Sequence, residues 1–367
     1  MRYLMHPYST LPERHFWRRF VSDVAWRDLP FMDAPKFTLQ PGDRVATAGS
    51  CFAQHITRYM KRSGLEPLVA ELAHPFVQAA DPALAQSYGQ FSARYGNVYT
   101  ARQMLELLRQ AAGTQPMVQD FVVDAGGRWY DLLRPGVPKD GFASLAEAQA
   151  DRRYHLRCVR QMFETVDVFV FTLGLTECWH HTQQGHTYPV CPGTLRGQYD
   201  PALHGFRNFN VREVMADIQA LIDEAHALNP TLRFVFTVSP VPLVATRSND
   251  NVLIASSYSK AVLRAAVGEV TQHCSAAEYF PSFEIINHAA SFGQYLASDL
   301  REVTDRGVGH VMACFLAAFY PALNSGITSP AANSAATPAC DAHPSQARPI
   351  ELPIECEEAF NDGPFVA

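Results

Sequence analysis

The stretch VDVFVFTLG, at residues 166–174, is an unbroken run of β-branched and aromatic residues that ends in glycine. Such runs are typical of strands that are buried on both faces of a parallel sheet. Similar apolar stretches occur at 43–48 and 232–242, and a last one, 276–286, is interrupted by Pro281. These four stretches are therefore the predicted strands of a mostly parallel sheet.

Helical periodicity separates the predicted strands. In the segment 51–62, for example, Phe52, Ile56 and Met60 share one helical face, and Thr100 stands where it can cap the helix that follows it. The predicted helices cover residues 51–62, 100–112, 144–165, 211–228, 251–271 and 303–320. Strands that alternate with helices in this way indicate an α/β fold whose sheet is covered on both faces.

The composition is that of a globular protein that forms a core. Of 367 residues, 47% are hydrophobic and 18% are charged, and the formal net charge is −6. This acidic balance argues against nucleic acid or an anionic membrane surface as a partner. The sequence predicts no membrane span and no signal peptide. Its eight cysteines form no CxxC pair, so we expect reduced thiols in a soluble, cytoplasmic protein.

Composition also predicts three segments. Residues 1–40 form an N-terminal extension that we expect to pack on the core, and residues 41–323 form the α/β domain. From about residue 324 the chain turns into an Ala/Ser/Pro-rich tail with little to bury, so 324–367 is predicted to be disordered.

Three polar stretches follow predicted strands. AGSCFA (48–53) follows the first, TLGLTECW (172–179) the second and TVSPVPL (237–243) the third. Ligands of open α/β sheets bind at the carboxyl ends of the strands, so these stretches predict a site at one sheet edge.

The motifs resemble those of the GSCFA-domain family, a branch of the SGNH/GDSL hydrolase superfamily. The resemblance covers roughly residues 30–320 and is carried by GSCFA (49–53), YGNVYTARQ (95–103), TLGLTECW (172–179), YPVCPGT (188–194), TVSPVPLVAT (237–246), SYSKAVLRAA (257–266), YFPSFEII (279–286) and DLREVTDRGVGHVM (299–312). It implies a three-layer α/β/α fold with a flavodoxin-like sheet, and ester hydrolysis or acyl transfer through a nucleophile, a histidine and an aspartate.

The superfamily's first block places the nucleophile two residues after glycine, which is the position of Cys51 here. A thiol at a helix N-terminus is favoured as thiolate by the helix dipole and the free N–H groups. Ser50 is the alternative nucleophile, although its hydroxyl needs a well-placed base. A third interpretation makes Cys51 a small buried residue that packs the turn.

The resemblance also implies an oxyanion hole. Gly96 or its neighbour Asn97 matches the second block, and Gly174 matches the glycine of the third. The third block ordinarily carries Asn two residues after that glycine, but Thr176 stands there, and Glu177 follows it. A threonine hydroxyl can donate a hydrogen bond, with a different reach from that of an asparagine amide. Gly174 as a plain turn and Glu177 as a paired carboxylate remain the alternatives.

The catalytic base is the largest departure from the pattern. The superfamily's last block reads Asp-x-x-His; Asp299 matches the aspartate, but Glu302 occupies the histidine position. We predict that His310, in the following helix, replaces that histidine, with Asp299 orienting it. His288 is the second candidate base. His55, one turn after Cys51, can reach the vicinity of the nucleophile but is expected to face solvent.

The stretch ECWHHTQQGHTYPVC (177–191) gathers three histidines and a cysteine, but its spacing matches no structural zinc pattern. We predict no metal and no cofactor, and expect this loop to line the substrate cleft. Within it, Trp179 and Tyr188 could stack on a sugar, or pack in the core.

The resulting prediction is an SGNH-like acyl-ester hydrolase or O-acyltransferase. It would act through an acyl-enzyme on a carbohydrate or small metabolite, with an acyl thioester as a possible donor. The alternative is a catalytically degenerate fold that binds a glycan or a partner. The sequence does not decide the acyl group, the acceptor or the oligomeric state.

Overall fold

The computed structural model describes residues 6–32, 34–73 and 88–321. At its centre is a four-stranded sheet with the strand order β1–β4–β8–β9. Every neighbouring pair is parallel. The strands are β1 (Val45–Gly49), β4 (Val168–Leu173), β8 (Arg233–Val238) and β9 (Ala277–Phe280). The prediction of a parallel central sheet is confirmed.

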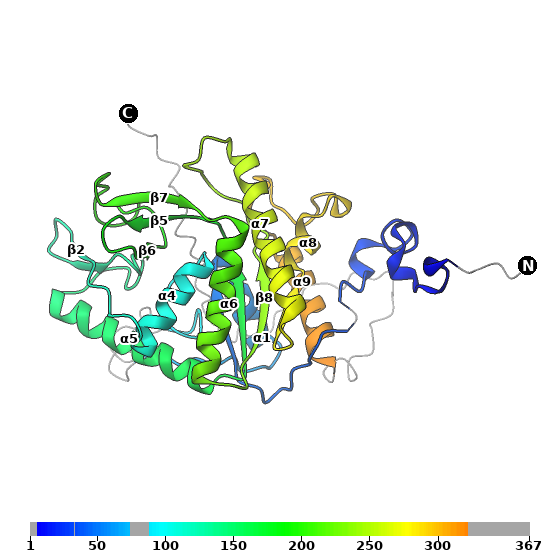
Figure 1. The fold of residues 1–367 in the computed structure, drawn as a ribbon, viewed down its shortest axis with the longest axis horizontal. Helices are drawn as coiled ribbons and strands as arrows, with labels where there is room; N and C mark the ends of the chain where they lie inside the picture. The colour runs from blue at the N-terminus through cyan, green and yellow to red at the C-terminus, as the bar shows by residue number, and fades with distance from the viewer. Residues whose placement is uncertain (1–5, 33, 74–87, 322–367) are drawn as a thin grey trace, which may run out of the picture.

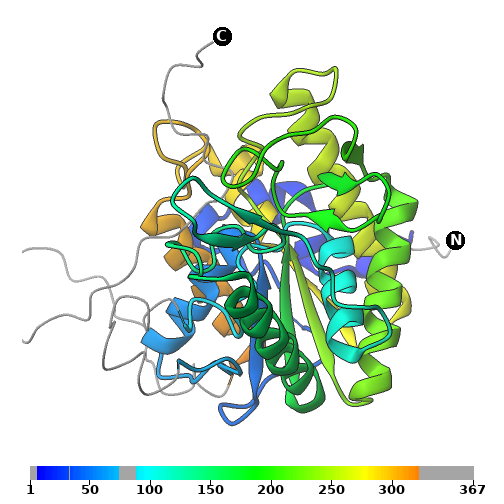
Figure 2. The same cartoon turned by 90° about the vertical axis from the view of Figure 1, so that its left-hand side faces the viewer.

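Helices cover both faces of the sheet (Figures 1 and 2). Alternate strand residues face opposite sides: Phe169 and Phe171 pack in one apolar cluster, Val168 and Val170 in the other. The first cluster is completed by α4 (Ala101–Ala112), α5 (Leu145–Thr165), α6 (Val211–Leu228) and α7 (Val252–His273). The second is completed by α1 (Cys51–Arg62), α8 (Ser282–Asn287) and α9 (Asp305–Phe319). The fold is the predicted three-layer α/β/α arrangement.

Local sequence sets the helix ends. Thr100 caps α4 as predicted by accepting the backbone N–H of Gln103, and the side chain of Gln103 bonds back to the cap to complete a capping box. The same helix ends at Gly113 in the left-handed conformation. Thr304 caps α9 through the N–H of Gly307.

One predicted strand is wrong in its second half. The sequence predicts one interrupted strand over 276–286, but β9 ends at Phe280 and α8 begins at Ser282. Pro281 lacks the N–H that a continuing ladder needs and adopts an N-cap position instead. The apolar residues Ile285 and Ile286 then pack as part of a helix.

Two small antiparallel sheets lie outside the central one. One pairs β2 (Phe121–Val123) with β3 (Trp129–Asp131). The other has the order β6–β5–β7, with β5 (Glu177–His181), β6 (Thr187–Tyr188) and β7 (His204–Asn208). The segment 177–191 thus contains two short strands, β5 and β6, where the sequence suggests a loop. Figure 1 shows this sheet at the same end of the molecule as the start of α7.

The segment before the core touches its second face. Trp26 donates its indole N–H to the carbonyl of Ile285 at 3.0 Å, and Phe31 packs against the second apolar cluster. Short helical turns cover Pro7–Thr10, Glu13–His15, Arg18–Ser22, Trp26–Asp28 and, later, Ala289–Ser291. The predicted domain boundaries stay predictions, and the tail predicted to be disordered falls outside the described residues from 322 onward. None of the helices in the described ranges is long and apolar enough to cross a membrane.

Candidate functional site at the carboxyl edge of the sheet

The turn between β1 and α1 is held tightly against β4. Gly49 has φ +141°, and a Cβ built on it would lie 2.4 Å from the carbonyl oxygen of Thr172. The N–H of Ser50 donates to that same oxygen at 3.1 Å. Only glycine fits this approach, and it places Cys51 at the first position of α1.

This close approach gives a first prediction. Gly49→Ala should lower the free energy of unfolding by about 3 kcal/mol, since the new Cβ meets backbone and the φ value disfavours any side chain. The matched control is Gly42→Ala, because a Cβ at Gly42 meets nothing within 4 Å, and its effect should stay within about 0.5 kcal/mol. Urea unfolding measures both, and equal effects would contradict this account of the turn.

Cys51 is 8% exposed and lines a cavity of about 800 Å³. The cavity walls come from α1, from Val241 after β8, and from the loop and helix start at 297–309. The thiol lies at the amino end of α1, where the helix dipole and the first backbone N–H groups favour a thiolate. The cavity gives this thiol room for a substrate.

His55 lies one turn after Cys51 and lines the same cavity. Residues four apart share a helix face, so the thiol and the imidazole project to the same side of α1. Burial, and then the charge of Arg58, lower the pKa of His55 to about 4, although Asp305 opposes the shift. The imidazole is therefore neutral at pH 7, and its unprotonated ring nitrogen can accept a hydrogen bond. The sequence alone predicts that His55 faces solvent, whereas in the structure its side chain is half-buried in the cavity wall.

Asp299 and Glu302 reach this cavity from the loop before α9. The carboxylate of Asp299 accepts the backbone N–H groups of Arg301 and Glu302, both at 3.0 Å, which lowers its pKa. Both hydrogen bonds lie within the turn 299–302 and stabilise it. Asp299 thus lines the same cavity as Cys51, and Glu302, at the position where the sequence analysis expects a histidine, also lines it.

His310 faces a different environment from Cys51. Its ring stacks on Tyr295 at 5.2 Å and meets Phe31 edge-on at 5.9 Å, and its Nε2 lies 4.0 Å from the sulfur of Cys314. In the described part of the chain, Gly309 lines the cavity but His310 does not. The structure does not bring together the predicted pair of His310 and Cys51.

His288, the second predicted base, is also engaged elsewhere. Its ring stacks on Trp26, and its Nδ1 accepts the N–H of Ala290 at 3.1 Å. Like His310, it therefore contacts the segment that precedes the core.

The predicted oxyanion residues of the second block lie beside the turn. Gly96 has φ +69°, and the N–H of Val98 donates to the carbonyl of Gly49 at 2.8 Å. Asn97 is 4% exposed and accepts a bond from Gln54 of α1 at 3.4 Å. The YGNVYT segment is thus packed against both the turn and the helix that begins at Cys51.

In the third block, Gly174 contacts the turn directly. A Cβ on it would lie 3.1 Å from the Cβ of Ser50, and its N–H donates to the carbonyl of Tyr99 at 2.8 Å. The hydroxyl of Ser50 is buried and has no hydrogen-bond partner within the described ranges. Thr176, by contrast, is fully buried and donates its hydroxyl to Asn208 at 2.7 Å. The hydroxyl proton of Thr176 is thus already engaged by Asn208.

Glu177 and Trp179 have structural partners. Glu177 accepts the hydroxyl of Thr246 at 2.5 Å and the N–H of Arg247 at 3.3 Å, so it holds the loop after β8. Trp179 packs edge-on against Phe206 of the neighbouring strand β7 and against Tyr199 in the loop before it. Within the described chain, neither residue lines the cavity of Cys51.

Two further residues, which the sequence does not single out, fix this edge from α7. Lys260 is 4% exposed and donates its ammonium to the carbonyl of Gly174 at 2.7 Å. Ser259 accepts the N–H of Thr176 at 3.0 Å. Both lie on the helix face that also carries buried Val262, Leu263 and Ala266. The available signal was a lysine at an otherwise apolar helical position in the SYSK motif.

Two of the histidines in the segment 177–191 are engaged with other protein groups. His181 accepts the backbone N–H groups of Gln183 and Gln184, and His186 pairs with Asp120 at 3.0 Å. Across residues 6–32, 34–73 and 88–321, no group of three possible ligands is suitably placed for a metal ion.

The fold, together with the turn between β1 and α1, defines a three-layer α/β protein with a candidate thiol site at the carboxyl edge of its sheet. A family profile matches residues 44–315, and the chain belongs to the GSCFA family. No curated protein sequence gave a significant match.

Two solved structures are loosely similar. One is an acetyl esterase mutant with an acetate ion, with a TM-score of 0.34 and 10% identity over 78% of this chain and 100% of that chain. The other is a carbohydrate esterase family 3 protein from Talaromyces cellulolyticus, with a TM-score of 0.29 and 12% identity over 77% of this chain and 99% of that chain. Similarities this low do not assign an activity.

Proposed function

We propose that this protein is an acyl-ester hydrolase or O-acyltransferase that acts through a covalent acyl-enzyme on Cys51. The observation that carries the proposal is the position of Cys51, at the amino end of α1 and in the wall of a cavity of about 800 Å³ that His55 also lines. A carbohydrate ester or a small metabolite ester is the proposed substrate, and an acyl thioester is a possible donor. The proposed location is the cytoplasm.

The reaction has two steps. The thiol of Cys51 gives its proton to neutral His55 and attacks the acyl carbon, and the leaving alkoxide takes that proton from the imidazolium. Water, or an acceptor hydroxyl, then attacks the thioester while His55 accepts its proton, and the proton returns to the departing thiolate. Backbone N–H groups at Cys51 and Gly96, with the amide of Asn97, are the proposed oxyanion donors.

His55 takes the base role in this proposal because it lines the cavity, whereas His310 contacts Phe31 and Tyr295. Asp299 shares the cavity wall with His55, but its carboxylate accepts N–H groups of its own turn. Its proposed part is to hold the loop 299–302 against the cavity.

A binding module remains the second candidate. It is favoured by Glu302 at the place of the expected histidine and by the engaged hydroxyl of Thr176. Such a protein would bind a glycan or a partner at the same edge without turnover.

Burst kinetics with p-nitrophenyl acetate separate the two candidates. A covalent acyl-enzyme releases one equivalent of p-nitrophenol per chain in a fast phase, followed by slower turnover. An added alcohol or sugar acceptor that speeds the slow phase would identify a transferase. Release at the rate of the buffer, with no burst from either the acetate or the octanoate ester, would contradict the enzyme proposal and favour the binding module.

The lowered pKa of His55 predicts an unusual acid limit. A histidine of ordinary pKa loses its basic form below about pH 6.5, whereas His55 stays neutral down to about pH 4. The value of kcat/KM should therefore stay level between pH 7 and 5 and fall as the pH approaches 4. Arg58→Gln removes one cause of the shift, so its acid limb should move to higher pH. An acid limb near pH 6.5 in the wild type would contradict this role for His55.

A further inference from the structure

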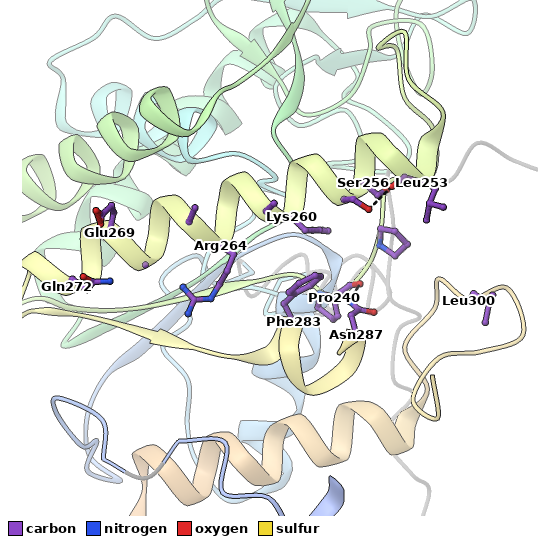
Figure 3. Close-up of a pocket in the computed structure, with 15 residues that line it drawn as sticks. Pro240, Leu253, Ser256, Lys260, Arg264, Glu269, Gln272, Phe283, Asn287 and Leu300 are labelled. Carbon is purple, nitrogen blue, oxygen red and sulfur yellow. Dashed lines mark hydrogen bonds between the residues drawn. The ribbon is translucent and has the colours of Figure 1, made fainter. Parts of the chain in front are cut away.

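A second cavity, of about 990 Å³, runs along α7 on the outer side of the molecule (Figure 3). One wall is a continuous face of α7, which includes Leu253, Ala261, Arg264, Ala265 and Gly268. Phe283 and Asn287 of α8 form the opposite wall. Eight of the fifteen lining residues are apolar or glycine, and the polar Glu269 and Gln272 lie toward the end of the groove opposite Leu253. The part of the groove along Ala261 and Ala265, facing Phe283, suits an elongated apolar ligand.

The two cationic side chains in the groove have their charged ends engaged. The ammonium of Lys260 donates to the carbonyl of Gly174, and the guanidinium of Arg264 pairs with Glu284 at 2.7 Å. That guanidinium also lies over the ring of Tyr279. The two residues therefore contribute mostly their aliphatic stems to the groove wall.

Two exposed leucines stand at one end of the groove. Leu253 on α7 is 72% exposed and Leu300 on the loop before α9 is 70% exposed. Figure 3 shows both at the same end of the groove, on opposite walls. Leu300 has φ +57°, a conformation that a leucine adopts only at an energetic cost. A strained and exposed leucine at a groove mouth suggests a binding role.

The groove shares its boundary with the cavity of Cys51. After β8, Pro240 and Pro242 line the groove while Val241, between them, lines the cavity of Cys51. In the loop before α9, Leu300 lines the groove while Asp299 and Arg301, on either side of it, line that cavity. Residues 240–242 and 299–301 thus form a ridge that has the groove on one side and the cavity of Cys51 on the other.

We infer that the groove along α7 binds the hydrocarbon chain of the acyl group whose ester reacts at Cys51. The inference rests on the proposed function and narrows its substrate class to esters of medium or long acyl chains. The ester lies at the ridge, and the chain crosses it and extends along α7 past Ala261 and Ala265.

A series of p-nitrophenyl esters tests the inference. Each methylene group that enters the groove should raise kcat/KM by up to about fourfold, so octanoate should exceed butyrate by roughly two orders of magnitude. In Ala261→Trp and Ala265→Trp, an indole fills the groove from an exposed helix position. We expect the octanoate-to-acetate ratio of kcat/KM to fall at least tenfold in both. Ala146→Trp, at an exposed position on α5, is the control and should keep the ratio of the wild type.

The substitution Leu300→Gly distinguishes a role of Leu300 in ligand binding from a role in stabilising the fold. Glycine accepts the positive φ without strain, so the melting temperature should stay level or rise. The octanoate-to-acetate ratio should nevertheless fall several-fold, because the mouth of the groove loses its apolar side chain. A purely structural role for Leu300 would not produce this combination.

Calorimetry with sodium octanoate provides a readout that does not depend on turnover. Octanoate should bind to the wild type and to Ala146→Trp, and more weakly to Ala261→Trp. If no ester is turned over but octanoate binds in this pattern, the proposed function fails and the groove assignment holds. A chain-length ratio near one in the wild type, or a ratio and octanoate binding that Ala261→Trp leaves unchanged, would overturn the inference.

Discussion

Replacement of Cys51 by alanine is expected to lower kcat/KM for p-nitrophenyl acetate by at least about 10³-fold. The variant keeps the helix start and the cavity but loses the sulfur atom that forms the thioester in the proposed mechanism. Because Cys51 is buried at 8% exposure and alanine is smaller, the fold should survive with a modest loss of stability. Steady-state kinetics and urea unfolding of the same preparation separate the two effects.

Cys274→Ala is the matched control for this substitution. Cys274 is a free, half-buried cysteine at the end of α7, outside the residues that line the cavity of Cys51 in the described chain. It should retain the activity of the wild type. A Cys51→Ala variant that is as active as this control would remove the thiol from the mechanism.

The second large effect is expected in a buried charge cluster between α5 and the strand β3. The guanidinium of Arg134 is 1% exposed, and it donates to Asp151 at 2.8 Å and to Asp131 at 3.2 Å. These partners raise its pKa against the opposing effect of burial. Arg134→Met keeps much of the volume but leaves buried carboxylates without this cation. It should lower the free energy of unfolding by about 3–5 kcal/mol.

An exposed ion pair provides the comparison. Arg44 bonds to Asp167 at 2.9 Å, but its side chain is 54% exposed. Arg44→Met should therefore cost no more than about 1 kcal/mol, because solvent screens the pair. Urea unfolding of Arg134→Met and Arg44→Met measures the loss of unfolding free energy in each variant. Similar losses would show that burial does not set the contribution of Arg134.

The layered fold could be predicted from the sequence because the spacing of apolar residues along a strand or helix follows directly from which of its faces are buried. VDVFVFTLG is apolar at nearly every position, and β4 lies in the middle of the sheet with both faces covered. The same reasoning predicted the stretch 276–286 wrongly. Over so few residues, the apolar pattern of a short strand followed by a short helix is the same as that of a single strand. The antiparallel pairing of β5 with β6 and β7 rests on contacts between distant residues that no local pattern shows.

The candidate site was predictable to the extent that motif spacing fixes backbone positions. Cys51 and Asp299 do line one cavity, as the motif pattern implied. The direction in which a side chain leaves a helix is harder to infer when the neighbouring element is unknown. His310 faces Phe31, from the segment before the core, whose contacts with α9 had no sequence signal. The buried positions of His55 in the cavity wall and of Lys260 beside Gly174 were not predictable, because an isolated polar residue on a helix more often faces solvent.

Intact-mass spectrometry after incubation with p-nitrophenyl acetate tests the central claim most directly. The wild type and Ser50→Ala should each gain the mass of one acetyl group, and Cys51→Ala should gain none. Peptide mapping should place the acetyl group on Cys51. An adduct that persists in Cys51→Ala and disappears in Ser50→Ala would contradict the account and make Ser50 the nucleophile.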